Sequence, residues 1–295
     1  MPELPEVETV TRGLNKFIVG KRIITITTNN FKSLPLYGQD IQDFVEGSII
    51  EKVHRRAKMI VIELSTKKSL VVHLKMTGQL VYRGQENWGG GHPSDSLVSS
   101  LPDKSTRVIF ELKDNKDQVS KLFFNDQRKF GWIKLFDTVE LAHAPIFINL
   151  GPEPLDNNFS FKPFNQQLNK RPNTKIKVAL LDQTVISGIG NIYADESLFA
   201  AKIMPDSIVS KIPTTARKTL FNEIKKILNL SISLGGSTSR NYLNAEGKKG
   251  NYLEFAKVYG RTGLECLVCK KNIISKIKLA GRGTHICTTC QKIYL

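Results

Sequence analysis

Four cysteines in the last thirty residues constrain the fold of this chain more than any other feature. They form two C-x2-C pairs with seventeen residues between the pairs, and the 295-residue chain has no other cysteine. Two such pairs supply four thiolates, the ligand set of a closed tetrahedral zinc site that stabilises a fold rather than catalysing a reaction. A reducible disulfide pair or chance clustering is the alternative. The spacing predicts one structural Zn²⁺ bound by Cys266, Cys269, Cys287 and Cys290.

The segment between the two cysteine pairs is basic. It reads KKNIISKIKLAGRGTHI and places Arg282 between two glycines. A zinc-stapled hairpin with an exposed arginine is suited to contact DNA. A zinc ribbon that packs against a partner protein is the alternative.

The whole chain is also basic. Its 43 Lys and Arg exceed its 27 Asp and Glu, for a formal net charge of +16. This excess favours nucleic acid, because binding releases counterions from the phosphates; general solubility or a lysine-rich genome is the alternative. The sequence has no apolar run of about 18 residues and no basic, apolar leader, so we expect a cytoplasmic protein without transmembrane helices.

The first half of the chain has the patterns of one helix followed by many strands. Residues 5–20 predict a helix, with Val7, Val10, Leu14 and Phe17 at helical spacing. Residues 70–82 alternate as a single strand would, with Met76 on its apolar face. Several short strands separated by turn signals predict an all-β sandwich. The expected strands are 58–64, 70–82, 106–112, 120–126 and 131–136.

The second half of the chain has helical patterns. Residues 84–105 are rich in Gly, Ser and Asp and predict a long surface loop, and the proline-rich stretch 141–156 predicts a linker. Beyond the linker, residues 237–255 are polar and glycine-containing, which predicts a mobile segment. The expected helices are 173–182, 191–203 and 214–236.

Six motifs occur along the chain in a recognisable order: MPELPEVETV, RRAKMIVIEL, HLKMTGQL, NDQRKFGW, GIGNIYADESLF and AGRGTHICTTCQ. Together they resemble the formamidopyrimidine-DNA glycosylase family, whose members repair oxidised purines. The resemblance implies an α+β multidomain fold: an N-terminal β-sandwich with a leading helix, a helical helix–two-turns–helix domain and a C-terminal zinc-finger β-hairpin, with DNA bound between the domains. The expected boundaries are 1–137 for the sandwich, 138–155 for a linker, 156–236 for the helical domain, and 237–295 for a lesion-recognition loop and the zinc finger.

The resemblance also implies catalytic roles. Pro2 resembles the nucleophile that attacks the sugar, and it becomes a free secondary amine only when Met1 is removed. Glu3 resembles the acid/base partner of the sugar, and Glu6 resembles a structural or proton-relay carboxylate. Without the other motifs, the preferred interpretation of Glu3 would be a solvated charge at the chain end. Lys58 resembles a lysine near the scissile sugar and its phosphate, and Arg282 the finger arginine that binds phosphate and assists elimination.

Six further residues resemble DNA contacts. His73 and Asn191 resemble phosphate contacts, although an isolated His is usually just exposed and an Asn that opens a helix can serve only as its N-cap. Ser105 and Arg107 lie where relatives carry a histidine, and His92 is a possible replacement. For the remaining three residues, the resemblance implies a wedge that fills the gap left by a flipped nucleotide. Taken alone, Met76 and Phe130 would instead be interpreted as residues of the hydrophobic core. The wedge residues are Met76, Arg128 and Phe130.

The implied function is that of a monomeric, nucleoid-associated DNA glycosylase with abasic-site lyase activity, acting on double-stranded DNA. One alternative is the endonuclease VIII type, which acts on oxidised pyrimidines; Leu4 and the wedge set favour the purine enzyme. A catalytically inactive zinc-finger protein is a second alternative, and the intact Pro2, Glu3 and Lys58 argue against it. The choice between 8-oxoguanine and ring-opened purines stays open, because the recognition loop varies within the family.

Overall fold

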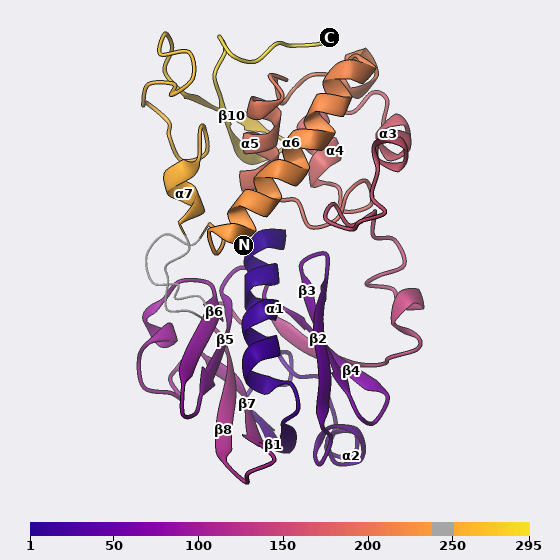
Figure 1. The fold of residues 1–295 in the computed structure, drawn as a ribbon, viewed down its shortest axis with the longest axis vertical. Coiled ribbons are helices and arrows are strands. Elements are labelled where there is room, and N and C mark those ends of the chain that lie inside the picture. Colours follow the sequence, from indigo (N-terminus) through magenta and orange to yellow (C-terminus); the bar gives the residue numbers. More distant parts are fainter. Residues whose placement is uncertain (238–250) are drawn as a thin grey trace. The chain divides into compact units, whose positions relative to one another are not determined.

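A computed structural model describes residues 1–237 and 251–295 (Figure 1). The chain divides into two compact units. The first unit contains Met1–Ile148 and Gly235–Asn251, and the second contains Asn149–Leu234 and Tyr252–Leu295. The predicted domain boundaries remain a prediction.

Helix α1 (Leu4–Ile18) leads the first unit and confirms the predicted helix. Pro5 lies in the first turn, where its missing N–H costs no hydrogen bond. The helix ends just before Gly20, which adopts a φ of 83° that a residue with a side chain rarely takes. Its apolar side chains are buried in the core of this unit: Val7, Val10, Leu14 and Phe17.

Two antiparallel sheets form the sandwich predicted for the first unit, and their facing sides enclose one hydrophobic core together with α1. Figure 1 shows α1 between them. The five-stranded sheet has the order β1 (Arg22–Thr28), β7 (Thr106–Lys113), β8 (Val119–Asp126), β5 (Gly78–Arg83) and β6 (Asn87–Gly91). The four-stranded sheet has the order β2 (Ile50–Arg56), β3 (Met59–Leu64), β4 (Lys68–His73) and β9 (Trp132–Asp137). A short helical turn, α2 (Gly38–Asp40), lies between β1 and β2.

The prediction of one continuous strand over 70–82 is wrong. The chain leaves the four-stranded sheet at His73, turns, and enters the five-stranded sheet at Gly78. Lys75 adopts a φ of 51° in this turn, and the Gly78 N–H donates to the Leu74 carbonyl at 2.8 Å. A Cβ on Gly78 would lie 2.4 Å from the Leu74 oxygen, so the turn requires glycine.

The prediction that residues 84–105 form only a loop is wrong in part, because Asn87–Gly91 form the edge strand β6, which pairs with β5. Trp88 is buried, and its ring lies so close to α1 that a Cβ on Gly13 would come within 2.1 Å of it. A Cβ on Gly90 would lie 2.9 Å from the Val10 side chain. The glycines that suggested a loop instead allow β6 to pack against the helix.

The second unit is largely helical. Helices α4 (Ile176–Leu181), α5 (Asn191–Ala200) and α6 (Thr214–Ser233) fall within the three predicted ranges. Helices α3 (Phe161–Asn169) and α7 (Tyr252–Phe255) were not predicted. α6 is followed by Gly235 and Gly236, which adopt φ values of 78° and 90°. The predicted linker contains a 3₁₀ turn at Leu141–His143.

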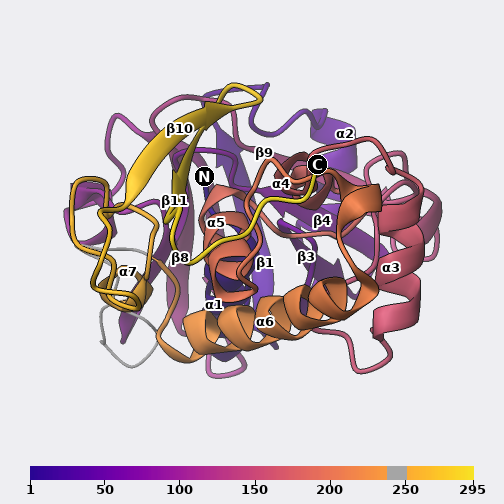
Figure 2. The same cartoon turned by 90° about the horizontal axis from the view of Figure 1, so that it is seen from above.

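The zinc-finger hairpin, β10 (Ser275–Leu279) and β11 (Arg282–Ile286), belongs to the same unit. Ala280 and Gly281 form its two-residue turn with φ values of 48° and 75°. Figure 2 shows the hairpin beside α5, to which it is joined by a hydrogen bond from the His285 N–H to Asp195 at 2.9 Å. Within residues 1–237 and 251–295, no helix is long and apolar enough to cross a membrane.

Candidate active site and DNA-binding residues

The first predicted catalytic group lies at the N-terminal end of α1. Pro2, Glu3 and Glu6 are all buried. The Glu6 carboxylate accepts the Glu3 N–H at 2.8 Å through Oε2 and the Ser237 N–H at 2.7 Å through Oε1. Gly236 passes so close that a Cβ would lie 3.1 Å from Glu6 Oε1. Glu6 therefore holds the start of the chain against residue 237, where the predicted lesion-recognition segment begins. The remainder of that segment, 238–250, lies outside the described residues.

The terminal amine, which in this structure belongs to Met1, lies among charged side chains of the first unit. Burial is the main cause that lowers the pKa of this amine below its usual value. Glu3 and Glu6 raise the pKa, whereas Lys58 and Arg128 lower it. The structure thus brings three predicted catalytic residues and one predicted wedge residue close to the chain terminus. A lowered pKa increases the neutral, nucleophilic fraction of an amine.

Lys58 lies in a tight turn between β2 and β3 and is only 7% exposed. Ala57, the other residue of the turn, has a φ of 54°. Arg55 fastens the turn to α1: it donates to the Glu8 carboxylate at 3.0 Å and to the Ala57 carbonyl at 2.9 Å. This bridge positions Lys58 relative to the start of the helix.

His73 ends β4 as a neutral imidazole. Burial, followed by the nearby Lys75 and Lys58, lowers the pKa of His73 to about 3. Its Nδ1 accepts the Lys75 N–H at 3.0 Å, so the ring proton resides on Nε2. His73 can therefore donate one hydrogen bond from Nε2, as the predicted phosphate contact requires.

The three predicted wedge residues lie on two turns at the same end of the five-stranded sheet. Met76 is 39% exposed and Phe130 is 55% exposed, so neither is a core residue. The Arg128 guanidinium stacks over the Phe130 ring at 4.9 Å from its centroid. Exposed apolar side chains beside a stacked arginine suit insertion into a base stack.

His92 directly follows β6, and its N–H donates to the Gly78 carbonyl at 3.0 Å. Burial lowers the pKa of His92, the chain-terminal amine lowers it further, and Asp126 raises it. The imidazole therefore lies within electrostatic range of the terminal amine. The 84–105 segment thus brings His92 near the Met1 amine.

Ser105 and Arg107, which occupy the region where relatives carry a histidine, both face inward. Ser105 is buried and donates to Asp103 at 2.7 Å. Arg107 is buried and donates from Nε to the Asp126 carbonyl at 2.8 Å and from Nη2 to the Lys104 carbonyl at 2.9 Å. His92, the possible replacement, instead lies near the Met1 amine.

Asn191 and Arg282 come together in the second unit. Asn191 is the first residue of α5, and the N-cap is Gly190, so the interpretation of Asn191 as the capping residue is wrong. Its side chain instead donates to the Gly283 carbonyl at 3.0 Å, next to the exposed Arg282. A helix N-terminus beside an exposed arginine is a favourable environment for a phosphate.

A buried charged network beneath this pair was not predicted. Lys177 on α4 contacts Asp195 on α5 at 2.6 Å, and both side chains are at most 1% exposed. Lys177 also donates to the Thr284 hydroxyl at 2.6 Å, and Asp195 accepts the His285 N–H at 2.9 Å. The network fastens β11 to both helices and thereby fixes the position of Arg282 relative to Asn191.

We expect Lys177→Met to lower the stability of the protein by about 3–5 kcal/mol, because it leaves Asp195 buried without its cationic partner. Thermal unfolding monitored by circular dichroism measures the effect. The exposed Lys218 on α6 provides the control, and Lys218→Met should leave the transition unchanged. Equal stability of the two variants would contradict a structural role for the buried pair.

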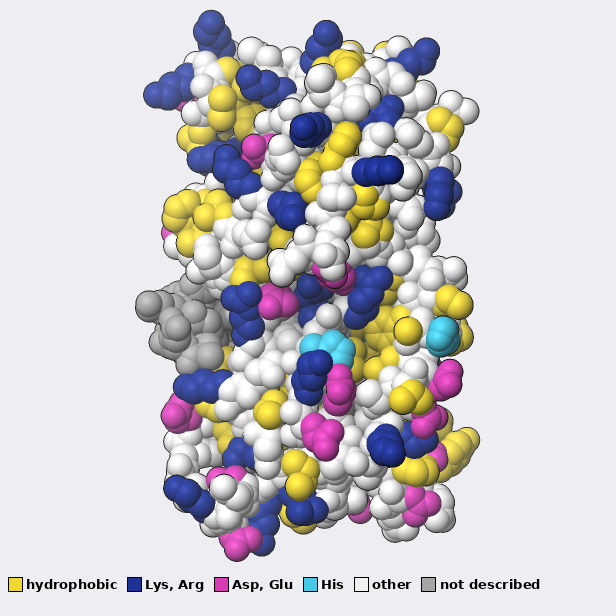
Figure 3. Space-filling view, turned by 45° about the vertical axis from the view of Figure 1, so that its right-hand side comes forward, with side chains coloured by type: hydrophobic (Ala, Val, Ile, Leu, Met, Phe, Trp, Pro, Cys, Tyr) yellow, Lys and Arg dark blue, Asp and Glu magenta, His cyan; other side chains and the backbone are white. Residues whose placement is uncertain are grey.

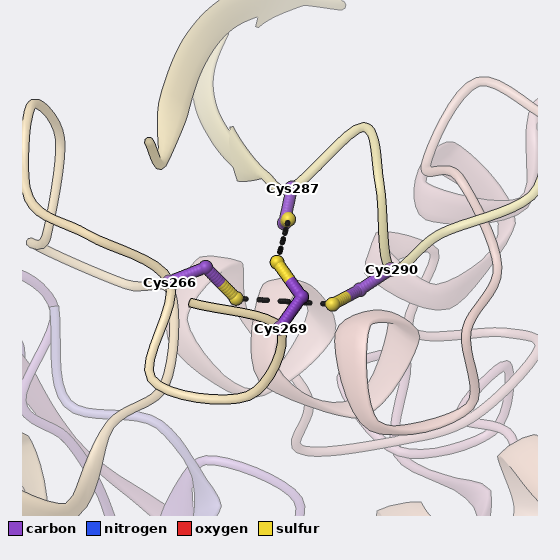
Figure 4. A group of neighbouring side chains, drawn as sticks. All are labelled: Cys266, Cys269, Cys287 and Cys290. Carbon is purple, nitrogen blue, oxygen red and sulfur yellow. Dashed lines mark hydrogen bonds between the residues drawn. The ribbon is translucent and has the colours of Figure 1, made fainter. Parts of the chain in front are cut away.

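The four cysteines converge as predicted (Figure 4). Their sulfur atoms all lie within 4.8 Å of one another. The Sγ–Sγ distance is 3.8 Å for Cys266 and Cys290 and 3.7 Å for Cys269 and Cys287. Four sulfurs bound tetrahedrally to zinc at about 2.3 Å are about 3.8 Å apart, so the geometry fits one structural zinc ion.

The surface of the second unit fits a polyanionic partner. On the face shown in Figure 3, this unit displays many Lys and Arg side chains and few acidic ones. The hairpin contributes Lys276 and Lys278, both exposed on β10. Since these lysines are two residues apart on a strand, they lie on the same face.

Comparisons with known families match three consecutive parts of the chain. Residues 1–133 match the formamidopyrimidine-DNA glycosylase N-terminal domain, and residues 150–242 match the formamidopyrimidine-DNA glycosylase H2TH domain. Residues 263–293 match a zinc finger found in FPG and IleRS.

Individual relatives match over nearly the whole chain. Formamidopyrimidine-DNA glycosylase of Streptococcus pyogenes serotype M3 is 40% identical, and that of Desulforamulus reducens 37%, each over 99% of both chains. Among solved structures, a variant of Lactococcus lactis Fpg in complex with DNA containing Fapy-dG has a TM-score of 0.85 at 34% identity, covering 99% of this chain and 100% of the other. MutM in complex with DNA containing carbocyclic 8-oxo-G has a TM-score of 0.83 at 35% identity, with the same coverage. The chain belongs to the formamidopyrimidine-DNA glycosylase family.

Proposed function

We propose that this protein excises oxidised purines from double-stranded DNA and then cleaves the strand at the resulting abasic site. The observation that carries the proposal is the buried group at the start of α1, where Pro2 and Glu3 lie beside Lys58. Similar proteins in solved structures are bound to DNA with Fapy-dG, carbocyclic 8-oxo-G or an abasic site, which supports the substrate class.

The reaction begins at Pro2, which has a free secondary amine once Met1 is removed. Its nitrogen bonds to C1′ of the damaged nucleotide while the bond from C1′ to the base breaks, and the base leaves with a proton. Glu3 protonates the sugar ring oxygen, so the ring opens to an iminium ion. Pro2 is itself buried, and burial favours the neutral form of an amine.

Strand cleavage follows from the iminium ion, which acidifies the C2′ proton. Loss of this proton expels the 3′ phosphate by β-elimination, and a second deprotonation expels the 5′ phosphate by δ-elimination. Lys58 and Arg282 are suited to stabilise the departing phosphates by charge. Hydrolysis then releases Pro2 for another turnover.

Each unit supplies its own candidate phosphate contacts. His73 donates from Nε2, and His92 supplies the contact otherwise made by the family histidine near Ser105. Asn191 and Arg282 bind the backbone through the α5 N-terminus and the hairpin. Met76, Arg128 and Phe130 fill the gap left by the flipped nucleotide, where Arg128 can hydrogen-bond the orphaned base.

The endonuclease VIII type is the second candidate function. Leu4, the wedge set and relatives named formamidopyrimidine-DNA glycosylase all favour purine lesions instead. The proposed enzyme acts as a monomer on duplex DNA. The substrate implies that it works at the nucleoid, in the cytoplasm.

Borohydride trapping tests the proposal. Wild-type protein incubated with a duplex containing 8-oxoguanine opposite cytosine should form a covalent adduct, and mass spectrometry should first verify that Pro2 is the N-terminal residue. Pro2→Gly should lose most of the adduct, whereas Pro5→Ala, which leaves the terminal amine in place, should retain it. Equal adduct yield for Pro2→Gly would contradict the mechanism, and preference for a thymine glycol duplex would favour the endonuclease VIII type.

A further inference from the structure

The wedge proposed above consists of two separate pieces of chain. Met76 lies on the turn between β4 and β5, whereas Arg128 and Phe130 lie on the turn between β8 and β9. All three side chains protrude from the sheet, so core packing does not hold them in register. A wedge of this kind requires contacts that fix the position of one turn relative to the other.

Asp126 is the residue that both turns share. It ends β8, it is 0% exposed, and it pairs across the sheet with Gly78, the first residue of β5. Its Oδ1 accepts a hydrogen bond from the Thr77 hydroxyl and another from the Arg128 N–H at 3.1 Å. Its Oδ2 accepts the Gly131 N–H at 2.6 Å. One carboxylate thus binds Thr77, the neighbour of Met76, together with Arg128 and Gly131, the neighbour of Phe130.

Thr77 completes the link. While its hydroxyl donates to Asp126, its oxygen accepts the Arg128 N–H at 3.1 Å. The Arg128 N–H is therefore shared between Asp126 and Thr77, one acceptor from each turn. This arrangement joins the two wedge segments directly.

The position of Asp126 is itself tightly determined. Its N–H donates to the Ser105 carbonyl at 2.8 Å, and its carbonyl accepts Nε of the buried Arg107 at 2.8 Å. A Cβ on Gly131 would lie 3.1 Å from Asp126 Oδ2 and 2.7 Å from the Phe124 ring, so the second turn closes directly over the carboxylate. Lys129 reverses the chain with a φ of 59°.

We propose that Asp126, together with Thr77, is a positioning residue that sets the geometry of the Met76–Arg128–Phe130 wedge. The inference rests on the proposed function, since it assigns a supporting structure to that wedge. Three donors converge on the two carboxylate oxygens, and only an acceptor-only group satisfies all of them. An asparagine would turn an NH₂ group toward at least one donor and leave it without its partner.

The inference predicts that two substrates respond differently. A lesion inside a duplex must be extruded, which requires the wedge. An abasic site in a single strand has no stack to open, so attack by the terminal amine proceeds without the wedge. A misplaced wedge therefore impairs the first reaction and spares the second, whereas a general loss of folding impairs both.

The test compares Asp126→Asn, Thr77→Val and Thr77→Ser with the wild type. Single-turnover excision of 8-oxoguanine opposite cytosine measures the duplex reaction, and borohydride trapping on a single strand with an abasic site measures the other. We expect Asp126→Asn and Thr77→Val to reduce duplex excision by about 10-fold to 100-fold, the cost of a misplacement of about 1 Å. Trapping on the single strand should stay at the wild-type level, and Thr77→Ser, which keeps the hydroxyl, should excise as the wild type does.

Each other outcome overturns the inference. Unchanged duplex excision in Thr77→Val and Asp126→Asn would show that the contacts do not position the wedge. Equal losses on both substrates, with lowered unfolding temperatures, would reduce Asp126 and Thr77 to a folding role. Wild-type protein that fails on both substrates would overturn the proposed function as well, so the two failures are distinguishable.

Discussion

Glu3→Gln is expected to reduce the single-turnover rate of base excision by about 10²–10⁴-fold, the usual contribution of a positioned general acid or base. Glu3 adjoins the nucleophilic Pro2 in the chain and is only 3% exposed, so water has little access to replace it. The amide cannot protonate the sugar ring oxygen. The backbone contact survives, because it is the Glu3 N–H that donates to Glu6.

The measurement is excision of 8-oxoguanine from a duplex, with DNA affinity determined in parallel. Affinity should change little, because glutamine matches glutamate in size. Glu86→Gln provides the control: Glu86 is exposed and pairs only at the surface with Lys16, at 3.0 Å. A Glu3→Gln rate within a few-fold of the Glu86→Gln rate would exclude Glu3 from proton transfer.

Removal of zinc is expected to abolish tight DNA binding. Structural zinc contributes about 10–16 kcal/mol to the folding of small zinc domains, far more than the apolar contacts of this finger can replace. Without the metal, the segments around Cys266 and Cys287 separate and Arg282 loses its fixed position. Fluorescence anisotropy with labelled duplex, before and after chelation, measures the loss, and added Zn²⁺ should restore binding.

Arg282→Ala distinguishes the contribution of the arginine itself from that of the folded zinc finger. This variant should keep its zinc and bind DNA more weakly. The slope of the logarithm of the binding constant against the logarithm of the salt concentration should become shallower by about one. Lys270→Ala, which removes an exposed charge from the first cysteine knuckle, is the matched control. Unchanged affinity after chelation would show that the zinc module does not present Arg282 to DNA.

Local patterns predicted the regular elements well and the turns poorly. The apolar spacing of Val7, Val10 and Leu14 was sufficient for α1 because the helix packs on one side. The alternation over 70–82 concealed a turn, because Lys75 takes a positive φ that no sequence rule assigns to lysine. Strand β6 was missed for the opposite reason, since Gly90 and Gly91 indicate a loop until the close approach of α1 to Gly90 and of β5 to Gly91 is known.

In the candidate site, too, contacts between residues close in sequence were predictable and contacts between distant residues were not. The cysteine pairs are close in sequence and have a fixed spacing, so their meeting was predictable. The supporting contacts join residues that are far apart in the chain: Lys177 meets Thr284 across 107 positions, and Asp126 meets Thr77 across 49. The periodicity of a single sequence gives no information about such distant pairs.

The burial of Pro2 has a practical consequence for the preparation of this protein. An affinity tag or cloning scar before Pro2 would keep its nitrogen as an amide, as Met1 does while it is present, and Met1 is 48% exposed, so such an extension has a path to solvent. Such a fusion could fold, bind zinc and bind DNA, yet fail to form the covalent adduct. The other end is open to modification, since Leu295 is 75% exposed. A tag therefore belongs at the C-terminus, and an inactive N-terminal fusion says nothing about the enzyme.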